Sequence, residues 1–127
     1  MGFIELPTNT WHEFFEGISE VIRGKLLELE VVGLDLGDQI VGAWLSVDGM
    51  TYEPVEDVLY VYTGPAESVD HAIWHPREIF VELGPAGVSQ VVVIDADDHK
   101  QFMRLRTPLE LPATNPASQI AQPKGLR

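Results

Sequence analysis

The chain has 127 residues, a length typical of one domain, and its 45% hydrophobic content predicts a packed core rather than disorder. Eight Lys and Arg residues against 20 Asp and Glu give a formal net charge of −12. This charge disfavours nucleic acid and anionic membranes as partners and is better matched to cations or a basic protein. Such a charge most often serves solubility. Cysteine is absent, which excludes disulfides, thiolate nucleophiles and cysteine-ligated zinc.

The N-terminal segment carries no targeting signal that we recognise. Met1 to Glu5 lacks a basic stretch followed by an apolar run. No window of the chain approaches the roughly 18 apolar residues of a membrane span. We therefore expect a cytoplasmic protein with no membrane association.

An amphipathic helix is the clearest local prediction. Apolar residues recur every three or four positions over about Trp11 to Arg23, which places them on one face. Thr10 and Glu13 have the spacing of a capping box, in which each side chain bonds an unpaired amide of the first turn. Gly24 suits the left-handed conformation that often ends a helix.

After Gly24 the apolar period changes to every second residue, which predicts six or seven short strands. We expect turns at Gly33 to Asp38 and at Asp48-Gly49. Pro76 interrupts one region, so that region forms either two strands or one bent strand. The last two strands should form a hairpin around the acidic turn 95–99. The expected strands are 27–31, 40–47, 58–63, 69–74, 79–83, 88–94 (nearly all apolar, hence central) and 101–107.

Together these elements predict a single α+β domain over residues 1–111. The N-terminal helix packs on a mostly antiparallel sheet that curls into a barrel or half-barrel, where the helix covers an open end or face. Residues 112–127 contain Pro112, Pro116 and Pro123 and have no apolar period. They predict an extended Pro-rich tail that wraps the surface, frays or docks on a neighbouring subunit.

Two histidines stand four residues apart on one predicted strand. His71 and His75 would share a face with Ile73. With Asp70 and Glu78 nearby they could bind a small ligand or a divalent metal, or act as acid and base. A structural role is favoured, because a histidine on a core-facing strand is usually buried and hydrogen-bonded. A catalytic zinc also needs about three protein ligands, and nothing fixes a third. We assign no metal and no cofactor.

The acidic turn resembles the opening of a calcium loop. Asp95, Asp97 and His99 occupy its first, third and fifth places. However, Lys100 stands where the loop needs glycine, and Arg106 stands where it needs a bidentate glutamate. Carboxylates also favour turns through local hydrogen bonds, so turn formation is the preferred interpretation.

Two arginines share a parity on the last predicted strand. The guanidinium groups of Arg104 and Arg106 could hold a carboxylate or phosphate of a ligand. In so acidic a chain we favour ion pairs with Asp or Glu on the neighbouring strand.

Aromatic residues are more numerous on the predicted strands than one sheet face needs. Trp44, Trp74, Tyr60 and Tyr62 are the residues that we assign to a candidate interaction surface. A second small core beneath the tail is an equal alternative.

Several spacings occur together and carry a family resemblance. They are Trp11 with Phe14, Gly24, the run Leu29-Glu30-Val31-Val32-Gly33 with Gly37 and Gln39, Leu45 with Gly49, His71-Ala72-Ile73 with Pro76, and Leu105-Arg106-Thr107-Pro108. In these positions the chain resembles domain-of-unknown-function family 5335, a group of small bacterial proteins, over about four fifths of its length. The resemblance implies a fold but no activity.

The resemblance also bears on where a site would lie. The chain departs from the family pattern in the acidic turn, where Asp98-His99 replaces an expected glycine, and this weakens the turn as a site. His71 is the one polar side chain on an otherwise apolar strand face. If the family shares a site, that site should begin at His71.

The leading functional interpretation is a small acidic interaction module that is not an enzyme, self-associates and engages a protein partner or a second copy. Catalytic motifs are missing, whereas aromatic and acidic residues are abundant. The alternative is a protein that binds a small ligand or a metal, and that could be an enzyme, centred on His71 with His75, Asp70 and an arginine of the last strand.

Overall fold

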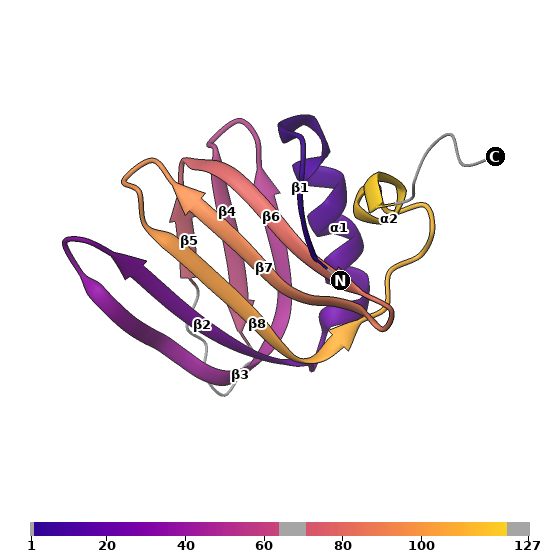
Figure 1. The fold of residues 1–127 in the computed structure, drawn as a ribbon, viewed down its shortest axis with the longest axis horizontal. Helices are drawn as coiled ribbons and strands as arrows, with labels where there is room; N and C mark the ends of the chain where they lie inside the picture. Colours follow the sequence, from indigo (N-terminus) through magenta and orange to yellow (C-terminus); the bar gives the residue numbers. More distant parts are fainter. Residues whose placement is uncertain (1, 64–70, 122–127) are drawn as a thin grey trace.

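The computed structural model describes residues 2–63 and 71–121, in which a long N-terminal helix packs on an open, curled antiparallel sheet and a short helix follows the last strand (Figure 1). The eight strands follow the order β1-β6-β7-β8-β2-β3-β4-β5. This confirms the α+β class. In chain order the elements are β1 (Gly2–Glu5), the 3-10 helix η1 (Thr8–Thr10), α1 (Trp11–Ile22), β2 (Leu26–Gly33), β3 (Gly37–Glu53), β4 (Val58–Thr63), β5 (His71–Trp74), β6 (Pro76–Gly84), β7 (Gly87–Asp95), β8 (Lys100–Leu109) and α2 (Pro116–Ala121).

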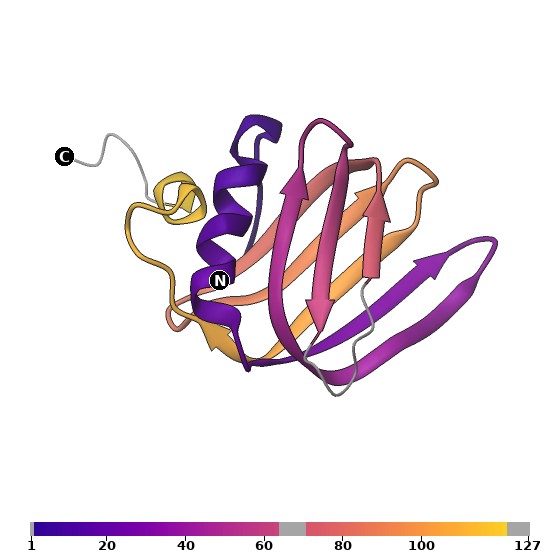
Figure 2. The same ribbon diagram turned by 180° about the vertical axis from the view of Figure 1, so that it is seen from behind.

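Strand β3 bends the sheet into two layers. Its residues up to Ser46 pair with β2, and those from Val47 onward pair with β4. A register shift between Val47 and Gly49 replaces the turn that we predicted at Asp48-Gly49, so the strand continues through a β-bulge. Figure 2 shows the short layer β3-β4-β5 lying across β6, β7 and β8.

The sheet is not closed into a barrel. Its terminal strands are β1 and β5, and each has one neighbour among the residues that the structure describes. The closed barrel, one of the two forms that we predicted, is therefore wrong, and the sheet has one strand more than the upper number of the six or seven predicted. The missed strand is β1, a four-residue edge strand that pairs with β6.

Helix α1 packs its apolar face into the bend of the sheet, chiefly against β3. It ends one residue earlier than predicted, and Gly24 adopts the expected left-handed conformation with φ of 81°. The predicted capping box is wrong. Thr10 also ends η1, and its hydroxyl donates backward to the carbonyl of Pro7 at 2.7 Å. The buried helix residues are Trp11, Phe14, Phe15, Ile18 and Ile22.

The core lies between the two layers and α1. Every second residue of β6, β7 and β8 points into this core, among them Ile79, Val91 and Met103. Strands β4 and β5 contribute Leu59 and Ile73 from the opposite layer. Alternation of side chains across each strand accounts for this division, because successive residues point to opposite faces.

The C-terminal segment differs from the predicted extended tail. Residues 116–121 form helix α2, and the side-chain oxygen of Asn115 accepts the amide hydrogen of Ala117 at 2.9 Å as an N-cap. Asn115 and Ala117 are both buried. The part of the predicted tail at 122–127 lies outside the described residues.

Candidate functional site

A hydrogen-bonded chain runs from His71 into the acidic turn. Nε2 of His71 lies 2.7 Å from Oε1 of Gln101 on β8, and Nε2 of Gln101 donates to Oδ2 of Asp95 at 3.0 Å. Because the amide oxygen of Gln101 only accepts, His71 must carry its proton on Nε2. Gln101 and Asp95 are each only 5% exposed, so this is a polar group set into the apolar core.

Asp95 organises the turn between β7 and β8. Its Oδ1 accepts the backbone amides of Asp97 at 2.9 Å and of His99 at 3.0 Å. A cation-sized cluster does exist, since ligand atoms of Asp95, Asp97 and His99 lie within 4.8 Å of one another. The carboxylate of Asp95 is nevertheless committed to the turn and to Gln101, which agrees with the turn interpretation preferred from the sequence.

His99 ties this turn to the turn between β2 and β3. Its Nε2 lies 2.9 Å from Oδ1 of Asp35, and its Nδ1 lies 3.6 Å from Oδ2 of Asp95. The hydrogen bond to Asp35 raises the pKa of His99 above its ordinary value. The same bond lowers the pKa of Asp35, so both groups favour their charged forms.

The structure does not bring His75 to His71. His75 follows the end of β5 and has φ of 55°, a left-handed conformation that interrupts the strand alternation on which our prediction depended. Its Nδ1 lies 3.2 Å from Oδ2 of Asp57, whose Oδ1 accepts the hydroxyl of Tyr52 at 2.7 Å. Burial, and secondly this hydrogen bond, raise the pKa of Tyr52 to about 12.

Arg104 and Arg106 also lie away from His71, because they project from the opposite face of β8. Arg104 pairs with Glu30 at 2.6 Å and with Glu28 at 3.2 Å, both on the neighbouring strand β2, as favoured from the sequence. Arg106 instead lies over the ring of Trp44, with 5.4 Å between its guanidinium carbon and the ring centre. The fifth ligand-binding candidate, Asp70, lies outside the described residues.

The four aromatic candidates are divided between two places. Tyr60 and Tyr62 stack on the outward face of β4 with 6.1 Å between ring centres, and Trp74 is exposed on the neighbouring strand β5. Trp44 lies instead on β3, beside Arg106.

Sequence reasoning missed an apolar surface on the face of β1, β6, β7 and β8 that points away from the core. We call it the outer patch, and it consists of Phe3, Phe80, Val92, Ile94 and Phe102. With Lys100 these residues line a shallow groove of about 260 Å³. A usable signal was present, because a run as apolar as 88–94 is typical of a strand covered on both faces.

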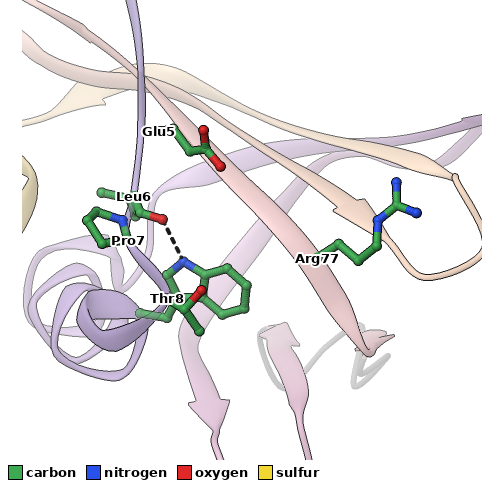
Figure 3. Close-up of a pocket in the computed structure, with 6 residues that line it drawn as sticks. Glu5, Leu6, Pro7, Thr8 and Arg77 are labelled. Carbon is green, nitrogen blue, oxygen red and sulfur yellow. Dashed lines mark hydrogen bonds between the residues drawn. The ribbon is translucent and has the colours of Figure 1, made fainter.

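A second hollow lies between the start of the chain and β6 (Figure 3). It has a volume of about 290 Å³ and is lined by Glu5, Leu6, Pro7, Thr8, Trp11 and Arg77. Its polar groups are largely engaged: the indole of Trp11 donates to the carbonyl of Leu6 at 3.0 Å, and Arg77 donates to Asp98 at 2.6 Å. We assign no ligand to it.

Comparison with known proteins places the chain in a family. An uncharacterized protein of Aquifex aeolicus (strain VF5) is 29% identical over 107 residues, which cover 84% of this chain and 95% of that protein. No solved structure matches the chain. None of the helices in 2–63 and 71–121 is long and apolar enough to cross a membrane. The model of the family of unknown function DUF5335 matches residues 4–114, and the chain belongs to that family.

Proposed function

We propose that this protein is a small interaction module without catalytic activity of its own, which self-associates through the outer patch. The observation that carries the proposal is the exposure of several large apolar side chains on one sheet face. Phe3 is 51% exposed, and Phe80, Ile94 and Phe102 are half-buried. Exposed apolar clusters with a polar rim mark interaction sites on otherwise ordinary domains.

The environment of the outer patch supports this use. Figure 1 views the sheet from this side, and no described helix or second layer covers β7 and β8 there. Phe80, Val92 and Phe102 stand side by side on adjacent strands, because they are register partners. Val92 is only 8% exposed, since its two aromatic neighbours cover it.

Light scattering after size-exclusion chromatography tests the proposal. We expect the unmodified protein to be a dimer, and Phe102→Asp to be a folded monomer because it places a carboxylate in the apolar contact. Val55→Asp is the matched control, since Val55 is a fully exposed apolar residue in the turn between β3 and β4. A monomer at every concentration of the unmodified protein, or equal behaviour of all three proteins, would refute the proposal.

A second candidate function is supported by the polar chain at His71. The imidazole of His71 bonds the buried amide of Gln101, which bonds the buried carboxylate of Asp95, and an imidazole in such a polar set is a group that can bind a small ligand or a metal ion. We place it second because the proposed partners His75, Arg104 and Arg106 do not converge on His71.

A thermal-shift screen with divalent metals and small carboxylic acids tests this second candidate. Stabilisation of the unmodified protein should disappear in His71→Ala and persist in His12→Ala, which alters an exposed histidine of α1. The absence of any shift in the unmodified protein would remove the candidate.

A further inference from the structure

The outward residues of β6, β7 and β8 form a regular grid. Strand register places three residues in each row across the three strands, with β7 in the middle. The rows are Glu78-Ile94-Lys100, Phe80-Val92-Phe102 and Glu82-Gln90-Arg104.

The two flanking columns of this grid are complementary. The β6 column consists of Glu78, Phe80 and Glu82. The β8 column consists of Lys100, Phe102 and Arg104. Each β6 residue therefore has a counterpart of opposite charge, or of equal size and polarity, in the same row of β8. The central column on β7 is uncharged.

From this pattern we infer the geometry of the self-association, in which the second copy of the chain binds the outer patch in one defined orientation. The inference rests on the proposed function above. The two copies pack face to face about a two-fold axis that runs parallel to β7 and passes over Val92. This rotation places β6 of each copy over β8 of the other. Phe80 then meets Phe102, Val92 meets its own copy, and Glu78 and Glu82 meet Lys100 and Arg104.

Charge is the reason to choose a second copy over another partner. A chain with a net charge of −12 repels itself in most orientations. This orientation instead places two of the eight cationic side chains, Lys100 and Arg104, against carboxylates of the other copy. Closed two-fold contacts use one self-complementary surface twice, and aligned sheets pack with their strands about 30° apart.

Lys100 and Glu78 are the diagnostic pair. Within the described chain neither has an ion-pair partner, whereas Arg104 is engaged by Glu28 and Glu30, and Glu82 accepts the amide of Gln90 at 3.2 Å. Lys100 is also exposed beside the apolar groove. Outside the three strands the pattern is less favourable, because Glu5 would face Glu30 and Phe3 would face Glu28, but the twist of packed sheets separates their corners.

Charge reversal provides a specific test of this arrangement. Glu78→Lys sets lysine against Lys100 twice in a dimer, and Lys100→Glu sets glutamate against Glu78 twice. We expect each single variant to raise the dimer Kd at least tenfold in sedimentation experiments. The double variant exchanges the two charges and should restore the Kd to near its original value. An equimolar mixture of the two single variants should also dimerise, because both ion pairs re-form between unlike copies.

Two controls exclude a general effect of charge. Glu20→Lys and Lys25→Glu change exposed residues near α1 by the same amounts and should leave the dimer Kd unchanged. Loss of dimer in Phe102→Asp without rescue in the double variant or the mixture would overturn this arrangement while leaving self-association through the outer patch intact. A monomeric unmodified protein would overturn both.

Discussion

The two faces of β6, β7 and β8 are built from alternate residues of the same strands, yet they differ in what covers them. The inward residues Ile79, Val81, Val91, Val93 and Met103 are at most 2% exposed and belong to the core. The outward residues of the outer patch are also apolar, but no described element packs on them. Apolar residues on both faces of a strand therefore predict that both faces are covered, and within residues 2–63 and 71–121 only the inner face is.

The largest expected effect separates these faces on one strand. Met103→Ala removes a fully buried side chain and should lower the free energy of unfolding by about 2–5 kcal/mol. Phe102→Ala, at the adjacent outward position, should lower the free energy of unfolding of the monomer much less, and its effect on the proposed dimer should appear only at high protein concentration. Urea unfolding at low protein concentration measures both. Equal losses would show that the outward face already contributes to the monomer core.

A smaller effect is expected at Asp95, a buried polar residue at the end of β7. Asp95→Ala leaves the amides of Asp97 and His99 and the side chain of Gln101 without their acceptor, and an unpaired buried group costs about 1–3 kcal/mol. Asp97→Ala is the control, since Asp97 is exposed. If thermal unfolding of the two variants were alike, the polar chain would not be part of the packed interior.

The smallest expected effect concerns the ion pair between His99 and Asp35 at the end of the sheet. Because the pKa of His99 is raised, its ion pair stabilises the folded protein fully at pH values below the ordinary pKa of 6.5. This stabilisation is lost as the pH rises through the pKa of His99 in the folded protein. Because the pKa of Asp35 is lowered, its ionised carboxylate stabilises the folded protein fully at pH values above the ordinary pKa of 3.8, and this stabilisation is lost as the pH falls through the pKa of Asp35 in the folded protein. NMR titration should find the pKa of His99 above 6.5, and lower in Asp35→Asn. An unchanged pKa in that variant would contradict the pairing.

Much of the fold could be predicted from local periodicity. The helix at Trp11, strand β4 and the hairpin of β7 and β8 follow from apolar spacing and turn residues, and the structure confirms them. The errors arise where tertiary context decides. Strand β1 exists because β6 offers it an edge, and the bend of β3 depends on pairing with two different strands. Neither condition is visible in a short window of sequence.

The candidate site shows the same limit. Strand alternation correctly placed His71 on the core-facing side of its strand, and composition favoured the pairing of Arg104 with glutamates. The position of His75 depends on a backbone conformation that Asp57 holds from a distant turn, and no spacing rule reports it. The outer patch was missed because the aromatic residues were counted without assigning each to a face.

The junction at His75 has one further consequence. Strands β5 and β6 stand far apart in the strand order, but a single residue joins them, and its backbone bonds both Asp57 and Ala96. The link through His75 thus joins two strands that are not hydrogen-bonded neighbours in the sheet, and it limits how far apart the two layers can lie. Lengthening this link by a few glycines should let the two layers slide apart, whereas the same insertion between the exposed residues Pro85 and Ala86 of the β6–β7 turn should leave the layers in place.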